Sequence, residues 1–593
     1  MLCEKYKDAL PQESIARAKE VCQNVGANVS VKITKRLDGV YSAVLSEDDC
    51  GWVTCGKGTN AAYCEASAFG EAIEHMSHHF AYNMNALSEA ALNSCGFQRY
   101  PDEQLLPIDE IPVLAPEVLR DMHDAYSLAA GRMVSDEEIC TFLKRVFDSE
   151  TTVFVPYYSV RRKCTVMLPE LLITNLCGTN GCGAGNTPEE AVGHGLDELA
   201  ERFAKYRIYN EGITPPEVPR EYIEKECPDI AKTISEIENS GKLRVLVKDC
   251  SLGVGFPVVA VLLIDYENQK YMANLGSHPR FEIALERCIT EMFQFYESGS
   301  SYLHRKKMSR WNEVPDSVLN SAKNWVSLLK DDVGFLSDSF FAGDPEWEFS
   351  PWHRADGYTN RQGVNEQIKI FSEFSDDIFI RNNSYLGFPA YRVYIPGIST
   401  THLPFDESQF ECAELCSWLI EKREKKESFS KEELIAIKDK VFGLQLFASS
   451  IFFHNMLESV SYALYAALEY ELGNTGACAR LLKLQDDPRC DAAAKVIELR
   501  DAGISAEKIR KLIELFFDEE AAEFGLCWCG KDVFARLFDM CSGHTMQLIP
   551  EKSCKSNETA TDRLHVRIKE EMIKHVIDQN AAGMLLKDAD RWV

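Results

Sequence analysis

The sequence has no long hydrophobic run and no excess of basic residues. Each absence argues against one class of protein. The longest apolar run, residues 258–264, is far shorter than the roughly 20 residues of a membrane-spanning helix, so we expect no membrane span. The 593 residues carry 64 Lys and Arg against 92 Asp and Glu, a formal net charge of −28. This charge argues against direct nucleic-acid binding, because binding phosphates requires clustered basic side chains.

Three further features describe the class of protein. Residues 1–14 carry charges where a signal peptide would need an apolar stretch, so we expect a cytoplasmic protein. The 21 cysteines are scattered over a long chain, which favours free thiols over the disulfide framework of short secreted proteins. The length exceeds what one hydrophobic core of about 250–300 residues accommodates, so several domains are expected.

Two regions with different hydrophobic patterns follow one another. Up to residue 405, alternating apolar stretches such as 29–34 and 391–395 interleave with helical spacing, which predicts a mixed α+β domain with several sheets. Residues 406–593 have helical spacing and few strand signals, which predicts an all-α domain. Residues 461–482 fit a tetratricopeptide-like helical hairpin and equally an ordinary bundle. Either would serve partner binding or self-association.

The α+β domain contains an internal duplication. Residues 56–75 and 183–202 align at an offset of 127 without a gap, and each copy has a glycine pair followed by a helix with Glu-x-x-Glu. The sequence therefore predicts a duplicated loop–helix unit.

Three predicted helices carry carboxylates on a face distinct from their apolar face, and on the second of these helices Asp197 shares that face with Glu190, Glu198 and Glu201. Such a stripe is common on any surface helix, and Glu190 also completes a capping box with Thr187. The Glu-x-x-Glu pair nevertheless recurs in both copies, although like charges at i and i+3 repel, and a cation would relieve that repulsion. The candidate metal ligands are Glu71, Glu74, Glu190, Glu198, Glu201 and Glu291.

These carboxylates and glycine loops together indicate a nucleotide site. Carboxylates are hard oxygen ligands that suit Mg²⁺, which also takes substrate phosphates as ligands. The glycine loops precede helix N-termini, where backbone N–H groups and the helix dipole favour an anion.

Seven ordered motifs resemble those of the YcaO family. The motifs are Lys7 with Ser14, residues 56–58, 67–74, 180–187, 198–202, His278-Pro279 and 287–294. The resemblance covers nearly the whole chain, including the helical extension of stand-alone members. It implies an internally duplicated ATP-binding domain at 1–405, with its core at about 46–405, followed by the helical domain at 406–593.

The resemblance also implies an ATP site without a P-loop, in which the six glutamates hold Mg²⁺ and Mg²⁺ holds the phosphates. It further implies that Arg202 and Arg287 are the catalytic cations, which neutralise charge together with Mg²⁺ during phosphoryl transfer. The implied nucleotide contacts are Lys7, Ser14, Ser67, Asn186, Arg202 and Arg287.

Better-studied members of the family use ATP to phosphorylate a backbone amide oxygen after a nucleophile has added to the amide carbon. Azolines, thioamides or amidines result. The stand-alone group is associated instead with sulfur modification, a β-methylthiolation, of a small-subunit ribosomal protein. The resemblance therefore implies a protein or peptide partner, either that ribosomal protein or its modifying enzyme, and a homodimer.

Two alternatives stay open: a peptide-modifying thioamide or azoline synthetase, and a non-catalytic, nucleotide-gated adaptor. Two departures from the family pattern bear on this choice. His75 stands where members commonly have Arg, so a fixed cation is replaced by one that titrates near neutrality. Residues 587–593 lack the Pro-x-Pro-x-Pro tail of azoline-forming members, which argues against cyclodehydration.

Weaker signals lie elsewhere. Residues 525–532 imitate a P-loop but place Asp532 where Mg²⁺ needs Ser or Thr. The adjacent histidines 78 and 79 point apart on a helix and are expected to be core or surface residues. Zinc-ligand residue types occur together near the end, but their Cys-x-Cys spacing is atypical and buried free thiols are expected. These residues are Cys527, Cys529, Cys541 and His544.

Overall fold

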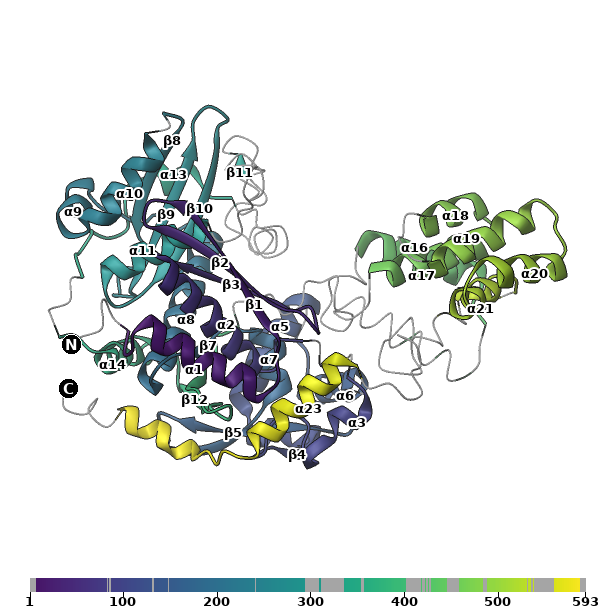
Figure 1. The fold of residues 1–593 in the computed structure, drawn as a ribbon, viewed down its shortest axis with the longest axis horizontal. Helices are drawn as coiled ribbons and strands as arrows, with labels where there is room; N and C mark the ends of the chain where they lie inside the picture. The colour runs from purple at the N-terminus through teal and green to yellow at the C-terminus, as the bar shows by residue number, and fades with distance from the viewer. Residues whose placement is uncertain are drawn as a thin grey trace.

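The structure is a computed structural model of the 593-residue chain. It describes residues 7–293, 309–310, 335–400, 428–444, 458–530 and 559–586, with gaps at 83, 85–86, 131–132, 148, 240, 353–356 and 484–487, together with residues 418, 422, 425, 532–534 and 537. The predicted mixed α+β fold with several sheets is confirmed, and so is the helical C-terminal region (Figure 1).

Three antiparallel sheets form the α+β body. The first has the order β1 (Val29–Leu37), β2 (Val40–Glu47), β3 (Val53–Gly58). The second has the order β11 (Ser309–Arg310), β10 (Lys270–Ser277), β9 (Val258–Asp265), β8 (Leu243–Asp249). The third runs β4 (Gln104–Pro107), β5 (Thr151–Ser159), β12 (Phe379–Asn382), β13 (Ala390–Tyr394), β7 (Cys182–Ala184), with β6 (Cys164–Pro169) paired to β5.

Helices surround these sheets (Figure 1). Those nearest the candidate site are α1 (Pro11–Asn24), α2 (Ala61–Ser77), α8 (Pro188–Glu211), α11 (Phe281–Met292) and α14 (Asn360–Phe371). The others include α5 (Pro116–Ala130), α6 (Asp136–Phe147), α7 (Glu170–Cys177), α9 (Arg220–Glu226), α10 (Pro228–Glu238) and α13 (Asp338–Ala342). Among the helices of the described residues, none combines the length and hydrophobicity that a bilayer crossing requires.

The predicted loop–helix unit occurs three times. In each copy a strand glycine lies against the first turn of the following helix: a Cβ added to Gly56 would lie 2.2 Å from the Cys64 carbonyl oxygen, and one added to Gly183 would lie 2.3 Å from that of Ala191. Gly276 takes the equivalent place in β10, where a Cβ would lie 2.7 Å from the backbone oxygen of the fourth residue of α11. The glycines are therefore required for close strand–helix packing.

The three units interlock in a ring. Helix α2 of the first unit contacts β7 of the second, α8 of the second contacts β10 of the third, and α11 of the third contacts β3 of the first. Helices α2, α8 and α11 thus present equivalent faces toward one another. This arrangement gives Glu71, Glu198 and Glu291 corresponding positions, four residues after Ser67, His194 and Arg287 respectively.

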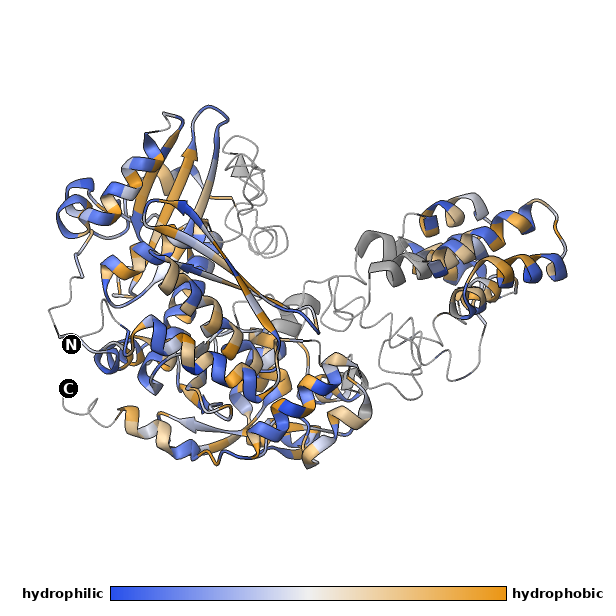
Figure 2. Cartoon of the chain, in the orientation of Figure 1, coloured by the Kyte–Doolittle hydropathy of each residue, from blue (hydrophilic) through white to orange (hydrophobic). Residues whose placement is uncertain are grey.

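Strand β9 confirms the predicted buried strand. It lies between β8 and β10, and its residues from Val258 to Leu263 are all buried. Alternate side chains enter two different hydrophobic cores, with Val258 and Leu262 on one side of the sheet and Val259 and Leu263 on the other. Figure 2 shows such apolar residues gathered inside the body and hydrophilic residues on outer helix faces.

Helices α16–α21 form a second body with a core of their own. They are α16 (Lys431–Leu444), α17 (Glu458–Glu471), α18 (Thr475–Lys483), α19 (Pro488–Asp501), α20 (Ala506–Phe516) and α21 (Glu519–Cys527). Consecutive helices pack on one another. Because bundles and helical repeats share this pairing, the tetratricopeptide-like character stays a prediction.

The last described helices pack on the α+β body, although the sequence pattern grouped them with the helical domain. Leu564 and Ile568 of α23 (Ala560–Met572) lie in the core that α2 and β5 share, and His565 Nδ1 lies 2.7 Å from Tyr82 Oη. The 3₁₀ segment η4 (Gln579–Leu586) continues along the same body. The boundary near residue 405 stays a prediction, because residues 401–417 lie outside the described residues.

Candidate functional site

Helix-capping residues fix where two of the three site helices begin. The side chain of Asn60 accepts a hydrogen bond from the Tyr63 backbone N–H (3.0 Å), which starts α2 directly after the first glycine loop. The side chain of Thr187 accepts from the Glu190 N–H (3.2 Å) and starts α8 at the matching position. The strand–loop–helix geometry therefore sets the positions of Glu71, Glu74, Glu198 and Glu201, which follow the caps about three to four turns later.

Five of the six predicted metal ligands form one acidic cluster, which we call the carboxylate cluster: Glu71, Glu74, Glu198, Glu201 and Glu291. Burial and then the charges of Glu291 and Glu198 raise the pKa of Glu71 to about 7. Burial and the Glu291 charge raise the pKa of Glu201 to about 7. Such shifts mean that the folded chain holds acids whose ionisation is unfavourable without a cation.

Two further carboxylates of the cluster, Glu74 and Glu198, behave alike. Burial, followed by the charges of Glu198 and Glu71, holds the pKa of Glu74 well above its ordinary value. Burial also raises the pKa of Glu198, whose carboxylate accepts a hydrogen bond from the Gly181 N–H at 3.3 Å. Glu198 and Glu291 keep 27% and 28% of their side-chain exposure, so solvent ions can reach them.

Three cationic side chains lie at this cluster. Lys57 pairs with Glu291, and its backbone N–H donates to Ser67 Oγ at 3.3 Å. The Arg202 guanidinium lies 3.7 Å from Glu198. Arg287 pairs instead with Asp197, 2.9 Å away, a residue that the sequence placed on the α8 stripe but not among the ligands.

The other predicted residues form a neighbouring group around Glu190, which is 4% exposed. Ser14 Oγ donates to Asn186 Oδ1 at 2.6 Å, and Asn186 Nδ2 donates to Glu190 at 3.0 Å. The Lys7 ammonium lies 3.0 Å from the Glu190 carboxylate. Burial opposes ionisation of Glu190, but Lys7, His194 and Asn186 outweigh it and hold the Glu190 pKa below its usual range.

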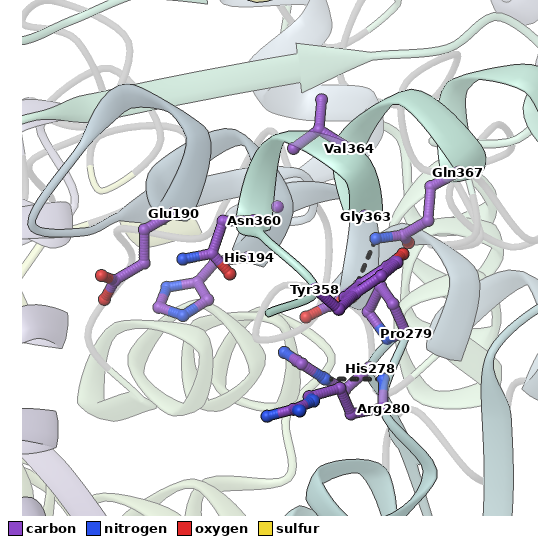
Figure 3. Close-up of a pocket in the computed structure, with 12 residues that line it drawn as sticks. Glu190, His194, His278, Pro279, Arg280, Tyr358, Asn360, Gly363, Val364 and Gln367 are labelled. Atoms are coloured by element: carbon purple, nitrogen blue, oxygen red, sulfur yellow. Dashed lines mark hydrogen bonds between the residues drawn. The ribbon is translucent and has the colours of Figure 1, made fainter. Parts of the chain in front are cut away.

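A pocket beside this group is lined by α8, by the loop before α11 and by α14 (Figure 3). In Figure 3, Glu190, His194 and Asn360 gather at one end, and Tyr358 and Gln367 lie at the other. The His194 Nδ1–H donates to the Ala184 carbonyl (2.9 Å) if its Nε2 accepts from Lys7, 2.7 Å away. The α14 residues were missed by sequence reasoning, because nothing in their spacing distinguishes them from an ordinary amphipathic helix.

The structure also places the weaker candidates. Burial lowers the pKa of His75, which packs edge-on against Phe80 with ring centroids 6.4 Å apart. His78 and His79 are buried and bond to different backbone carbonyls, so they are core residues. Residues 519–527 are helical, which contradicts a P-loop there.

The zinc hypothesis is not tested. Cys527 and Cys529 are partly buried, and Cys541 and His544 lie outside the described residues. In the described part of the chain, no group of three or more His, Cys, Asp or Glu side chains is arranged to hold a metal ion as it stands.

The carboxylate cluster nevertheless fits Mg²⁺ in donor type and charge. All its donors are carboxylate oxygens, which Mg²⁺ prefers. Their mutual repulsion raises their pKa values, and a divalent cation would relieve it. A lysine ammonium already interacts with the same carboxylates, which shows that the cluster attracts a cation.

The YcaO family model, described as YcaO cyclodehydratase, ATP- and Mg²⁺-binding, matches residues 55–399. The chain therefore belongs to the YcaO family. The predicted cofactors, ATP and Mg²⁺, are confirmed by this membership. The matched region contains all three repeat units and the whole carboxylate cluster.

Two curated relatives each match about two thirds of the chain. A Haemophilus influenzae protein with no assigned role is 29% identical over 403 residues, which cover 68% of this chain and 66% of that protein. The Escherichia coli ribosomal protein S12 methylthiotransferase accessory factor YcaO is 29% identical over 399 residues, 66% of this chain and 65% of that one. The chain thus matches a little under two thirds of each relative's length.

Among solved structures, the chain is similar to YcaO from Methanopyrus kandleri, bound with AMPPCP and Mg²⁺. It shares 15% sequence identity with this chain at a TM-score of 0.38, and the alignment covers 67% of this chain and 93% of that one.

Proposed function

We propose that this protein is an ATP- and Mg²⁺-dependent enzyme that activates an amide or carboxyl-derived oxygen of a protein substrate by phosphorylation. The carboxylate cluster carries the proposal. Glu71, Glu198 and Glu291 occupy corresponding positions on three interlocked helices, and burial and like charge raise the pKa values of Glu71 and Glu198. Repulsion between carboxylates destabilises the metal-free fold, so a purely structural role does not account for this arrangement.

The residues divide into two roles. The five glutamates of the carboxylate cluster would hold Mg²⁺ directly or through water, and Mg²⁺ would neutralise the phosphates. The group of Lys7, Ser14, Asn186 and Glu190, which gathers at the start of α8, would contact the nucleotide, and Glu190 would be the ligand of a second ion. Ser67, at the Lys57 backbone in the cluster, would add a further contact.

Arg202 and Arg287 would supply the catalytic positive charge. An amide oxygen is a poor leaving group, and converting it to a phosphate ester lowers the barrier to its loss. Phosphoryl transfer asks the protein mainly for positioning and charge neutralisation. No side-chain nucleophile is then required of the enzyme.

The biological role that we propose is support of sulfur modification of a small-subunit ribosomal protein. The name of the Escherichia coli relative supports it, together with the match over the whole YcaO domain. The family description names a cyclodehydratase, which favours a peptide-modifying azoline synthetase as a second candidate, and a thioamide synthetase stays open beside it. Mass spectrometry of the ribosomal protein from cells with and without this gene tests the first role, and an unchanged mass would exclude it.

Nucleotide binding is the direct test of the site. Calorimetric titration with AMPPCP is expected to show binding that requires Mg²⁺. Glu201→Gln is expected to weaken binding by about tenfold or more, because it removes a carboxylate from the cluster. Glu211→Gln is the matched control. Glu211 lies on the same helix, its side chain is 44% exposed, and it pairs with Arg207.

Two outcomes would contradict this proposal. Equal binding with EDTA, or equal affinities of the two variants, would remove the glutamates from the metal site. Tight binding without any ADP release in the presence of the protein substrate would favour the adaptor, in which the nucleotide only stabilises a surface.

Helices α16–α21 would serve partner binding or self-association, including the predicted homodimer. Because α23 packs on the α+β body, the test must excise residues 428–537 and keep residues 559–586. Light scattering and pull-down with the ribosomal protein would show whether the mass and the capture change. Unchanged results in both would contradict this role.

A further inference from the structure

Lys57 stands at the carboxylate cluster, although its residue type is not that of a magnesium ligand. It lies on β3, between the two glycines of the first loop. Its side chain is 22% exposed, and its ammonium pairs with Glu291 of α11. The contact joins the first repeat unit to the third, since β3 and α11 belong to different units.

The Lys57 charge reaches more than one carboxylate. It lowers the pKa values of Glu71 and Glu201, against the larger effect of burial. These glutamates lie on α2 and α8, so one ammonium acts on acids from all three units. The two arginines nearby are engaged with other acids, Arg202 with Glu198 and Arg287 with Asp197.

The chemistry of lysine suits a temporary cation. Its ammonium is a compact point charge on a flexible four-carbon stem, whereas a guanidinium is a rigid fork that forms fixed bidentate pairs. A partly exposed ion pair of this kind has modest net stability and can exchange for a stronger partner. Mg²⁺ carries twice the charge and prefers the same carboxylate oxygens.

We propose that the Lys57 ammonium neutralises the carboxylate cluster when no divalent ion is bound and is displaced from Glu291 when Mg²⁺ binds, so that Lys57 sets the Mg²⁺ affinity of the site. This inference rests on the proposed function, because it requires the glutamates to bind Mg²⁺. The competition has two consequences. Lys57 stabilises the metal-free protein. It also weakens Mg²⁺ binding by the free energy of the Lys57–Glu291 ion pair, because this pair must break when Mg²⁺ binds.

The test compares Lys57→Met and Lys57→Arg with the wild type. Mg²⁺ affinity is measured by calorimetry in the presence of AMPPCP, and thermal unfolding is measured with and without Mg²⁺. Lys57→Met is expected to bind Mg²⁺ about three- to tenfold more tightly and to unfold at a lower temperature in EDTA, with a larger gain on adding Mg²⁺. Lys57→Arg keeps the cation and is expected to show no such gain in affinity.

Lys19→Met is the matched control. Lys19 of α1 is 50% exposed and pairs with Glu65 of α2 at 3.0 Å. It is expected to leave the Mg²⁺ affinity and the Mg²⁺-dependent stability unchanged. Any gain seen in both Met variants would reflect net charge alone and would overturn the proposal.

A measurement on the wild type covers the case in which Lys57→Met does not fold. Reaction of Lys57 with an amine-reactive reagent, followed by peptide mass spectrometry, is expected to accelerate in MgCl₂ relative to NaCl of the same ionic strength. An unchanged rate would overturn the proposal. So would weaker Mg²⁺ binding by Lys57→Met, because Lys57 would then contribute to ligand binding.

The two levels of inference fail differently. Wild-type protein that shows no Mg²⁺-dependent AMPPCP binding would contradict the proposed function itself. If the wild type binds AMPPCP and Mg²⁺, and Lys57→Met binds Mg²⁺ with the same affinity as the wild type, only the competition between Lys57 and Mg²⁺ is contradicted.

Discussion

Arg287 of α11 donates a hydrogen bond to Asp197 of α8, with 2.9 Å between Nη1 and Oδ2. Asp197 is 2% exposed, and Gln367 of α14 donates to its other oxygen at 3.1 Å. One buried carboxylate therefore ties together three helices and orients the guanidinium that we assign to the phosphates. Arg287 keeps 23% exposure, so a ligand can reach its side chain.

Asp197→Asn is expected to weaken AMPPCP binding by about tenfold, because losing a charge-assisted hydrogen bond releases Arg287 from its fixed orientation. Calorimetry measures the affinity, and circular dichroism verifies the fold. Glu189→Gln is the control, since Glu189 also lies on α8 but pairs with Arg361 of α14 at 2.7 Å. Equal affinities for the two variants would show that Asp197 does not position the site.

Glu74→Gln is expected to raise stability while it lowers activity. The charge of Glu74 is disfavoured by burial and by Glu198 and Glu71, so the neutral amide removes a repulsion from the metal-free protein. Thermal unfolding in EDTA should occur a few degrees higher, and Mg²⁺-dependent ADP release should fall at least about a hundredfold. Glu65→Gln, on the same helix but paired with Lys19 of α1, should change neither.

Unfolding of Glu74→Gln at or below the wild-type temperature in EDTA would show that the carboxylate is structurally satisfied. Its activity would then carry no information about metal binding.

The pH dependence of stability should report the same cluster. The pKa values of Glu71 and Glu201 rise from 4.5 to about 7 on folding, chiefly through burial. The folded chain therefore binds more protons than the unfolded chain between these values, and their contribution to stability falls as pH rises from 4.5 to 7. Mg²⁺ binding, which needs the ionised form, should tighten over the same range.

Urea unfolding of the wild type and of Glu71→Gln in EDTA, at pH 5, 6, 7 and 8, isolates this effect. The variant should gain stability relative to the wild type as pH rises, because its amide does not titrate. A constant difference across the series would mean that Glu71 ionises normally in the folded chain.

How far the sequence determines this site can be judged residue by residue. Helical spacing and the exact 127-residue offset predicted that Glu71 and Glu198 occupy matching places, because a helix period is a local property. The sequence did not identify the third unit as a repeat, because Arg287 stands at the position that corresponds to Ser67 and no second glycine precedes α11. Only the contact of Gly276 with α11 reveals the equivalence.

Long-range partners could not be predicted at all. Asp197 was seen on a polar stripe, but its pairing with Arg287 depends on how two helices 90 residues apart approach. The return of α23 to the α+β body depends likewise on tertiary packing, because an apolar helix face does not specify the surface that covers it.

The repeat geometry itself gives the last prediction. Gly276→Ala places a Cβ 2.7 Å from the Ala284 carbonyl oxygen, so β10 and α11 must separate. We expect a loss of about 1–3 kcal/mol in the free energy of unfolding. The same separation should weaken Mg²⁺ binding, because α11 carries Glu291.

Gly70→Ala makes the matched comparison. Gly70 lies within α2, and an added Cβ would meet nothing within 4 Å. The substitution should therefore stabilise the helix by about 0.5–1 kcal/mol, through the higher helix propensity of alanine. Denaturant unfolding measures both variants. If Gly276→Ala were as stable as the wild type, the strand glycines would not be what sets the distance between strand and helix, and the interlocked ring would need another explanation for how it brings its carboxylates together.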